Sequence, residues 1–180
     1  VAESYRKIVC VGEWQRDMMH MGYKIPMEKM EVIGNFLMPE HFMVSDPPER
    51  EKHHFVYASS PDRGLVNLLR LWPRILELYP DATLDIFYGF RGLKKLGSSG
   101  GDAWMGRAEN LLKQYEMLRY QKGVTERGMV SHSQIAREFM RASVWTYPTD
   151  FTETFCSNAV KARAAGCVPV TSALAALNET

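Results

Sequence analysis

The stretch from residue 144 to residue 170 constrains the fold more than any other part of the sequence. An apolar strand is expected at Val144–Tyr147, and a polar turn follows it at Pro148–Thr152. Glu153 is then expected to open a helix that stops at Gly166, before a second buried strand. A carboxylate therefore stands where a strand ends and a helix begins. In open α/β sheets this edge binds ligands, and the free N–H groups of a helix start favour an anion there.

The rest of the chain repeats this alternation of short apolar segments with longer amphipathic ones. Strands are expected at His54–Ala58, Ala82–Tyr88, Val124–Val130, Val144–Tyr147 and Val168–Thr171. Helices are expected at Glu13–Met21, at Leu65–Tyr79 with a kink or break at Pro73, at Trp104–Tyr120, and from a cap at Ser131 to about Arg141. The alternation implies βαβ units, so we expect an α/β fold with a doubly wound, Rossmann-like parallel sheet. Five strands after residue 50, where such sheets commonly have six, indicate a truncated sheet.

The composition excludes several classes of protein. The 22 basic and 21 acidic residues give a formal charge of +1, which offers no reason to expect nucleic acid or an anionic membrane as a partner. No apolar run approaches the roughly 18 residues that a membrane helix needs, and no signal peptide is visible, so a cytoplasmic location is expected. The three cysteines are widely spaced without metal-type pairs, which indicates reduced, buried thiols.

Two charged residues next to strand ends are candidates for ligand binding. Arg63 follows the turn after a strand and precedes Gly64 at a helix start, where a cation beside free N–H groups could clamp a diphosphate. The plainer alternative is a solvated arginine that pairs with Asp62. Glu153 could orient a ligand through its carboxylate, or could simply be an acidic residue that the helix dipole favours at a helix start.

The segment around Glu153 also resembles a known family. It is similar to the donor-binding, C-terminal half of retaining glycosyltransferases of the two-Rossmann-domain (GT-B) type, whose signature is a Glu, seven residues, a second Glu and then Ala-x-Gly-x-Pro-Val. Glu153 matches the first Glu, and residues 165–170 match the end of the signature. Residues 12–15 and 27–35 resemble the end of the acceptor-side domain and the interdomain crossover. The resemblance runs from about Ile8 to Val170 and implies a fragment, with the end of an N-terminal domain at 1–45 and an incomplete nucleotide-sugar domain at 46–180.

The resemblance implies a role for each matching position. The intact enzyme would transfer a sugar from a nucleotide diphosphate donor, with retention, to an unknown acceptor. Glu153 would be the catalytic residue that orients the donor sugar, Arg63 with Gly64 and the Ser59 region would hold the diphosphate, and backbone groups of Val130 and Ser131 would contact the base. The diphosphate would also meet the segment Phe155, Cys156, Ser157 and Asn158. Arg63 and Glu153 are thus expected to lie on one rim with a sugar diphosphate between them.

Lys161 departs from the pattern, because it stands where the family has its second Glu. That Glu would bond the ribose hydroxyls, and an ammonium group can only donate. Lys161 could instead touch a ribose oxygen or a phosphate, or mark a homologue that has lost activity. A non-catalytic nucleotide-binding module is therefore the alternative function. A two-domain nucleotide-sugar epimerase, which shares the architecture, fits the Glu153 region less well.

The remaining features are expected to carry no chemistry. No metal or other cofactor is expected, since His53 and His54 have no ligand partners at metal spacing. Phe90 could pack on the base, and the loop at 97–101 lacks a phosphate-binding spacing. His132 is interpreted as a neighbour of the helix cap. An exposed apolar surface is expected at residues 1–30, where self-association is plausible.

Overall fold

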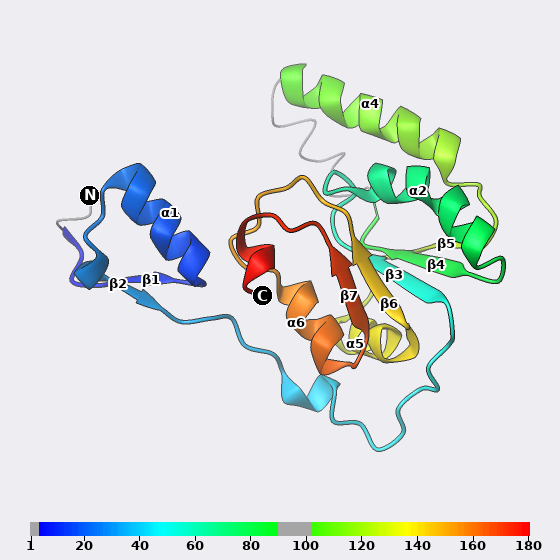
Figure 1. Cartoon of the computed structure of the whole chain (residues 1–180), viewed down its shortest axis with the longest axis horizontal. Helices are drawn as coiled ribbons and strands as arrows, with labels where there is room; N and C mark the ends of the chain where they lie inside the picture. The colour runs from blue at the N-terminus through cyan, green and yellow to red at the C-terminus, as the bar shows by residue number, and fades with distance from the viewer. Residues whose placement is uncertain (1–3, 90–101) are drawn as a thin grey trace.

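The computed structural model describes residues 4–89 and 102–180, without the side chains of residues 102–104. It contains a small sheet and a large one (Figure 1). The small sheet pairs β1 (Ile8–Cys10) with β2 (Met30–Val32). The large sheet consists of β3 (His54–Ala58), β4 (Thr83–Phe87), β5 (Val124–Gly128), β6 (Val144–Tyr147) and β7 (Val168–Thr171). All its pairings are parallel, which confirms the expected α/β fold.

The strand order of the large sheet is β5-β4-β3-β6-β7. Counted from β3, this is 3-2-1-4-5, the first five places of the doubly wound order 3-2-1-4-5-6. The chain moves outward in one direction from β3 and then returns to start again at β6. The order therefore reverses between β3 and β6. In sheets of this kind, ligands bind in the crevice beyond the carboxyl ends of the strands at this point.

Two pairs of helices cover the large sheet, one pair on each face (Figure 1). α2 (Leu65–Leu78) packs with α4 (Asp102–Leu118), and α5 (His132–Arg141) packs with α6 (Ser157–Ala164). Right-handed crossovers place the helices in this way, because the two halves of the sheet run in opposite directions from the reversal. The core between these layers is built on large side chains that are fully buried, among them Trp72, Phe139 and Trp145.

Most expected elements are present; β4, β5 and α4 differ from the expected bounds by one or two residues at an end, and three differences are more informative. β3, β6 and β7 have the expected bounds, and the helix expected at Leu65–Tyr79 forms as α2. α2 continues through Pro73, so of the two expected alternatives, a kink or a break, the break is wrong. α1 (Glu13–Tyr23) continues past Gly22, where the helix was expected to end. Its C-cap residue, Lys24, adopts the left-handed conformation. The helix expected to open at Glu153 begins only at Ser157.

The helix starts late because the backbone at Glu153 is used elsewhere. The Glu153 carbonyl accepts a hydrogen bond of 3.2 Å from the N–H of Ala176, which lies in a short 3₁₀ segment, η4 (Ala175–Asn178). A carbonyl at the first position of a helix would instead serve the residue four places later. The chain consequently stays irregular until Cys156, the N-cap residue of α6.

The amino-terminal part of the chain has its own small apolar cluster of Cys10, Ile25 and Met30. It also includes two short 3₁₀ segments, η2 (Met27–Lys29) and η3 (Pro39–His41). The N–H of Trp14 in α1 donates to Glu179 Oε2 at 3.0 Å, which links this part to the carboxyl terminus. In the sequence, both strands of the small sheet precede residue 45 and all strands of the large sheet follow residue 46. The division into two domains stays a prediction.

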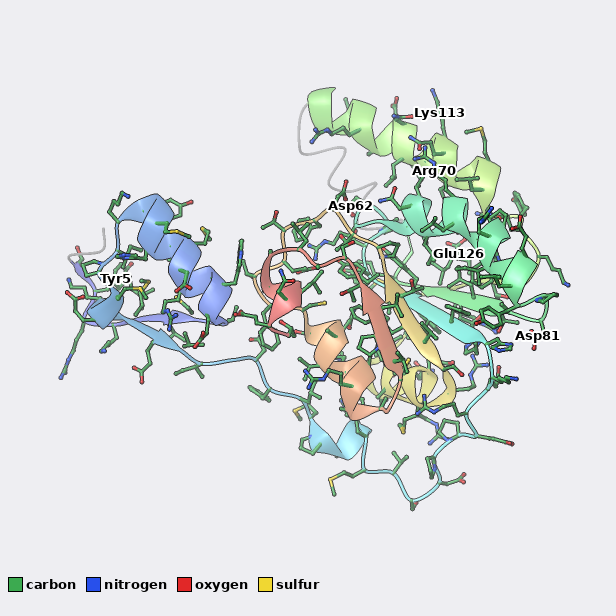
Figure 2. The ribbon with its side chains drawn as sticks, viewed as in Figure 1. Tyr5, Asp62, Arg70, Asp81, Lys113 and Glu126 are labelled. Atoms are coloured by element: carbon green, nitrogen blue, oxygen red, sulfur yellow. The ribbon has the colours of Figure 1, made fainter. Side chains whose placement is uncertain are left out.

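Exposed apolar side chains are present in the amino-terminal part, as expected. Tyr5, Val9, Met21 and Tyr23 are each more than half exposed, and Figure 2 shows Tyr5 far from the large sheet. Self-association through this surface stays a prediction. Cys10, Cys156 and Cys167 are all unpaired and buried, as expected, and their reduced state stays a prediction. Within the described residues, none of the helices combines the length and apolar character that crossing a bilayer requires.

Candidate functional site

Arg63 and Glu153 meet at the reversal of the strand order. Arg63 lies in the loop after β3 and Glu153 in the loop after β6, so both belong to the carboxyl-terminal rim of the sheet. Arg63 Nη1 lies 3.2 Å from Glu153 Oε1. The expected common rim is therefore observed, but the expected gap between the two residues is not. The two groups pair directly, so a diphosphate between them would have to displace this contact.

Glu153 is held by its own chain on a second side. Its side chain is almost fully buried, and the hydroxyl of Tyr147 donates to Oε1 at 2.6 Å. Burial and this hydrogen bond raise the pKa of Tyr147 to about 12. Ser59 extends the cluster, since its hydroxyl lies 3.4 Å from the Tyr147 hydroxyl. No pattern in the sequence pointed to Tyr147, which is there only the last apolar residue of an expected strand.

Arg63 pairs with Glu153 rather than with Asp62, the partner that its plainer interpretation required. The Asp62 carboxylate instead accepts a hydrogen bond from the Ser60 hydroxyl. Burial is the largest single influence and would lower the pKa of Arg63, but Glu153, Tyr147 and Asp62 together outweigh it and raise the pKa. The guanidinium also lies 3.8 Å from the centre of the Phe151 ring. Arg63 Nε is buried and has no acceptor among the described residues, so the arginine is not fully satisfied by the protein.

Gly64 is required by the way the two loops touch. Its φ is +97°, in the left-handed region that favours glycine. A Cβ at this position would lie 2.3 Å from the carbonyl oxygen of Pro148, which belongs to the loop after β6. The glycine thus lets the Arg63 loop approach the Glu153 loop closely enough for their charged side chains to pair.

The start of α6 lies beside this pair. Cys156 is the N-cap residue, and Ser157 and Asn158 are in the first turn, whose N–H groups are not used by the helix. The Asn158 side chain donates to the carbonyl of Ala58, the last residue of β3. Phe155 lies before the cap. The expected segment is therefore at the reversal, and its role in binding a diphosphate stays a prediction.

A cavity of about 160 Å³ opens at the ends of β3, β4 and β5. Val130, Asn158 and Lys161 line it, so three of the predicted binding residues share one cavity. Ser131 does not line it, and its hydroxyl caps α5 by accepting from the N–H of Gln134 at 3.2 Å. Met129 and Ile135 also line the cavity, although no pattern in the sequence indicated them. Phe90 and the loop at 97–101 lie outside the described residues.

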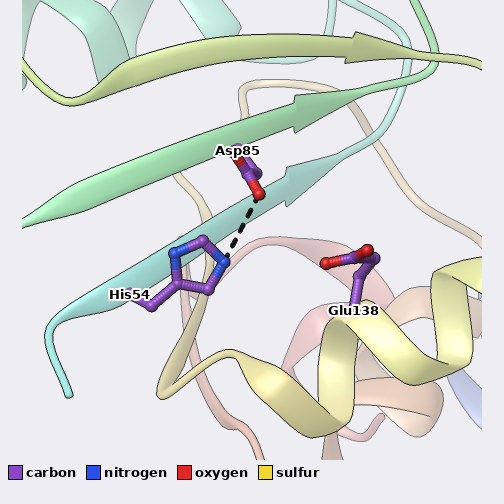
Figure 3. Close-up of side chains that lie close together, drawn as sticks. All are labelled: His54, Asp85 and Glu138. Atoms are coloured by element: carbon purple, nitrogen blue, oxygen red, sulfur yellow. Dashed lines mark ion pairs between the residues drawn. The ribbon is translucent and has the colours of Figure 1, made fainter. Parts of the chain in front are cut away.

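A second polar cluster lies on the face of the large sheet that α5 covers, away from the carboxyl-terminal rim. His54, Asp85 and Glu138 bring ligand-type atoms within 4.8 Å of one another (Figure 3), an arrangement the sequence did not predict. His54 Nε2 is buried without a hydrogen-bond partner and lies 3.6 Å from Asp85 Oδ2. Burial and the charge of Arg141 lower the pKa of His54.

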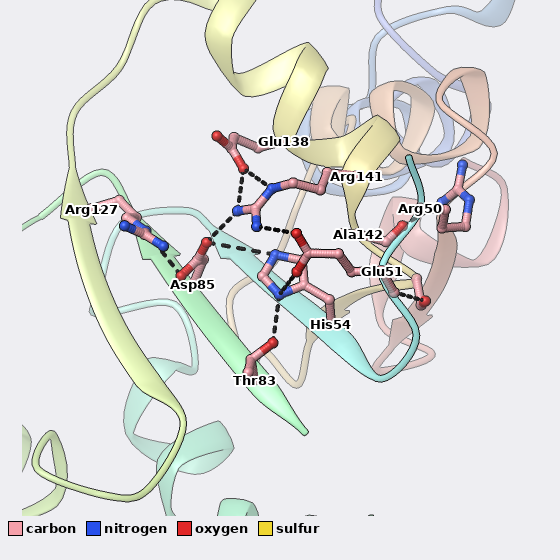
Figure 4. A network of polar contacts seen from close by, with 10 residues as sticks. Arg50, Glu51, His54, Thr83, Asp85, Arg127, Glu138, Arg141 and Ala142 are labelled. Carbon is pink, nitrogen blue, oxygen red and sulfur yellow. Dashed lines mark hydrogen bonds and ion pairs between the residues drawn. The ribbon is translucent and has the colours of Figure 1, made fainter. Parts of the chain in front are cut away.

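Arg141 bridges the two carboxylates of this cluster (Figure 4). Its Nη2 lies 2.6 Å from Asp85 Oδ2 and 2.6 Å from Glu138 Oε2, and its Nη1 lies 2.8 Å from Glu51 Oε1. Arg127 Nε adds a contact of 3.0 Å to Asp85 Oδ1. We therefore interpret the cluster as a network of ion pairs that links α5 to the large sheet and stabilises their packing. The absence of a metal from the function stays a prediction.

Comparisons with known proteins bear on the fold. No protein-family profile and no curated protein matches this sequence. HepE from Anabaena in complex with UDP is similar in structure with a TM-score of 0.72 at 12% identity, over 97% of this chain and 46% of HepE. A TarM variant from S. aureus in complex with fondaparinux, alpha-GlcNAc-glycerol and UDP gives 0.70 at 10% identity, over 96% of this chain and 31% of TarM. A glycosyltransferase from Rickettsia africae gives 0.66 at 15% identity, over 94% and 45%.

The chain has the fold of GT-B glycosyltransferases over the part that it covers. This confirms the resemblance inferred from residues 153–170 as far as the fold is concerned. The chain spans between about a third and a half of the length of these structures. At such low identity the likeness establishes the fold, and the function has to be argued from the site.

Proposed function

We propose that this chain is the donor-binding half of a glycosyltransferase, which moves a sugar from a nucleotide diphosphate sugar to an acceptor. The observation that carries the proposal is the Arg63–Glu153 pair at the reversal of strand order, beside a cavity at the ends of β3, β4 and β5. A cation, a carboxylate and a hollow for a nucleoside thus occur at the place where doubly wound sheets bind nucleotides.

In the proposed complex the donor displaces the direct contact between the two residues. Arg63 turns from Glu153 to the diphosphate, where a guanidinium makes strong, paired hydrogen bonds to phosphate oxygens. Glu153, still held through Oε1 by Tyr147, then accepts hydrogen bonds from hydroxyls of the sugar and orients its anomeric carbon. Arg63 thus exchanges one charged partner for another. Glu153 exchanges its charged partner for hydroxyl donors and keeps the hydrogen bond from Tyr147, so its carboxylate is not left without partners.

The transfer step follows from the same groups. As the bond between the sugar and the diphosphate breaks, negative charge grows on the leaving phosphate, and Arg63 and the first N–H groups of α6 stabilise it. We propose no metal or other cofactor, because these groups supply the positive charge. Retention of configuration is part of the proposal, since Glu153 and residues 165–170 follow the pattern of retaining enzymes. The acceptor is not assigned, and the chain by itself is proposed to bind the donor without turnover.

The proposal is tested by calorimetric titration of the chain with UDP, GDP and ADP and with their glucose derivatives. At least one should bind, and Arg63→Ala should weaken it by about tenfold or more, as expected for a lost hydrogen bond to a charged group. Glu153→Gln should bind the free diphosphate at least as well as the native chain, because Arg63 has no competing carboxylate, but should lose the preference for a sugar derivative. Arg74→Ala, at an exposed arginine of α2, is the matched control. No binding of any nucleotide, or equal binding by Arg63→Ala, contradicts the proposal.

Two observations favour a second candidate, a nucleotide-binding module without catalysis. Arg63 and Glu153 form an ion pair with one another, and Lys161 stands where a carboxylate would accept ribose hydroxyls. Restoring that carboxylate separates the candidates. If Lys161→Glu binds a nucleotide that the native chain does not bind, the site is a degenerate one.

A further inference from the structure

The cavity at the ends of β3, β4 and β5 is lined by basic side chains and by no acidic side chain among the described residues. Its polar side chains include those of Lys161, His132 and Asn158, and the described residues that line it include no aspartate or glutamate. A neighbouring hollow of about 350 Å³ shares Lys161 and His132, adds His41, and again has no acidic residue among its described lining. The rings of His41 and His132 are stacked, with their centres 6.5 Å apart. We call Lys161, His132 and His41 the basic corner.

Lys161 has no partner in the part of the chain that the structure describes. Its side chain is half-buried, and it makes no hydrogen bond or ion pair with a described residue. Burial accordingly lowers the pKa of its ammonium group. Elsewhere in the chain lysines find acceptors: the Lys122 ammonium, for example, donates to the Pro80 carbonyl at 2.8 Å. Holding an unpaired cation half out of water costs free energy, which an anionic ligand would recover.

The position of Lys161 fixes which end of a nucleotide it would meet. Lys161 is three places after Asn158 on α6, so both side chains lie on the same side of the helix and reach the same cavity. The other cavity walls include Ala58, Val130 and Ile135, which suit the flat face of a base. Neither Arg63 nor Glu153 lines this cavity. The basic corner is therefore separate from the groups proposed for the diphosphate, and lies at the nucleoside end.

We infer that the basic corner binds a phosphate monoester carried by the ribose of the nucleotide, so that the ligand is a ribose-phosphorylated nucleotide rather than one with a free ribose diol. The chemistry of the donor set decides between the two. A ribose diol needs acceptors, which a carboxylate supplies, whereas a ribose phosphate needs donors and positive charge. Lys161 offers three N–H donors and a full charge. This inference rests on the proposed function, because it assumes that a nucleoside occupies the cavity.

The test compares nucleotides that differ only in where their phosphates are placed. ADP, UDP and GDP are each compared with the same 5′-diphosphate that carries one more phosphate on the ribose, at the 2′ or the 3′ position, and with the 5′-triphosphate, which adds that phosphate at the other end. The native chain should bind one of the ribose-phosphorylated diphosphates about tenfold or more tightly than the plain 5′-diphosphate. Lys161→Met should abolish this preference, and Lys161→Glu should reverse it in favour of the free ribose.

Two controls keep a loss of charge or of folding apart from a loss of the site. Lys113→Met changes the net charge equally at an exposed position of α4 (Figure 2) and should keep the native preference. Thermal unfolding by circular dichroism should show that Lys161→Met is folded, and Lys161→Gln replaces it if it is not. Arg63→Ala should weaken the 5′-diphosphate and its ribose-phosphorylated forms by similar factors, since Arg63 lies outside the basic corner.

Each contrary result has a separate meaning. Binding of 5′-diphosphates that depends on Arg63, without a preference for a ribose phosphate, overturns this inference and leaves the proposed function standing. The inference is equally overturned if the preference survives Lys161→Met, or if the triphosphate gains as much affinity as the ribose-phosphorylated diphosphates. If the native chain binds none of the nucleotides, the result contradicts both the proposed function and this inference.

Discussion

Replacing Asp85 with asparagine should destabilise the chain strongly without changing the shape of the side chain. Asp85 is in the middle of β4, and its carboxylate is 4% exposed. Arg141 contacts one of its oxygens at 2.6 Å and Arg127 contacts the other at 3.0 Å (Figure 4). Asparagine keeps one acceptor, but its amide group turns two N–H donors toward a guanidinium that is itself only a donor.

The size of the effect follows from what each arginine does afterwards. Removing one partner of a buried ion pair typically costs about 3–5 kcal/mol, because the other charge is left uncompensated. Arg127 is half exposed and can turn to water, and Arg141 keeps its contacts with Glu51 and Glu138. Both facts place the loss at the lower end, at about 3 kcal/mol. For a chain of this size that is a shift of about 1–2 M in the urea midpoint.

Urea unfolding followed by circular dichroism measures this shift, with Asp81→Asn as the matched control. Asp81 also pairs with a basic side chain, His53 at 2.9 Å, but it is 68% exposed and water screens the contact. Its variant should unfold close to the native midpoint. Equal midpoints for the two variants would show that the network in the sheet is no more important than a surface pair, and the interpretation of Figure 4 would be wrong.

Two further substitutions test the structure at other points. Gly64→Ala should lower the free energy of unfolding, measured with urea, by about 3 kcal/mol, because left-handed backbone strain adds to overlap with Pro148. Gly106→Ala is the matched control: it lies inside α4 with open space around it and should raise the free energy of unfolding by about 0.5–1 kcal/mol. Changes of the same sign in the two variants would contradict this reasoning. Burial, reinforced by Arg141, lowers the pKa of His54 despite the carboxylates of Glu51, Asp85 and Glu138. As the pH falls, the imidazole of His54 is therefore protonated in the unfolded chain before it is protonated in the folded chain. The free energy of unfolding should fall as pH drops from about 7 to 5, by at most about 1.4 kcal/mol per pH unit for this group. Urea unfolding of His54→Gln over the same range should show a shallower fall, and identical slopes would contradict the assignment.

Elements whose signals are local could be predicted without coordinates. The bounds of β3, β6 and β7 follow from apolar runs between turn residues, and Ser131 with Gln134 three places later predicted the cap of α5. The alternation of strands and helices then led to the doubly wound sheet, because parallel neighbours need helical crossovers. These inferences succeeded because each depends on residues a few places apart.

Prediction from the sequence was wrong where a distant contact overrules a local preference. Glu153 resembles a helix start, but its carbonyl is taken by Ala176, and the helix begins later. The break expected at Pro73 fails similarly, because α2 buries Trp72 and its neighbours against the sheet and packs Ile75 and Leu76 beyond the proline. Periodicity alone cannot weigh such tertiary contacts against the intrinsic preference of a residue.

The character of the candidate site depends on packing between segments that are far apart in the chain. Arg63 and Glu153 are 90 residues apart, and they become partners because the strand order puts β3 next to β6. The same order gathers Lys161, His132 and Asn158 around one cavity, and it joins Asp85 to Arg141 on the covered face of the sheet. A pattern in sequence identifies residues capable of chemistry, but the distances and burial that set their charges and partners arise only when separate strands and helices are packed together.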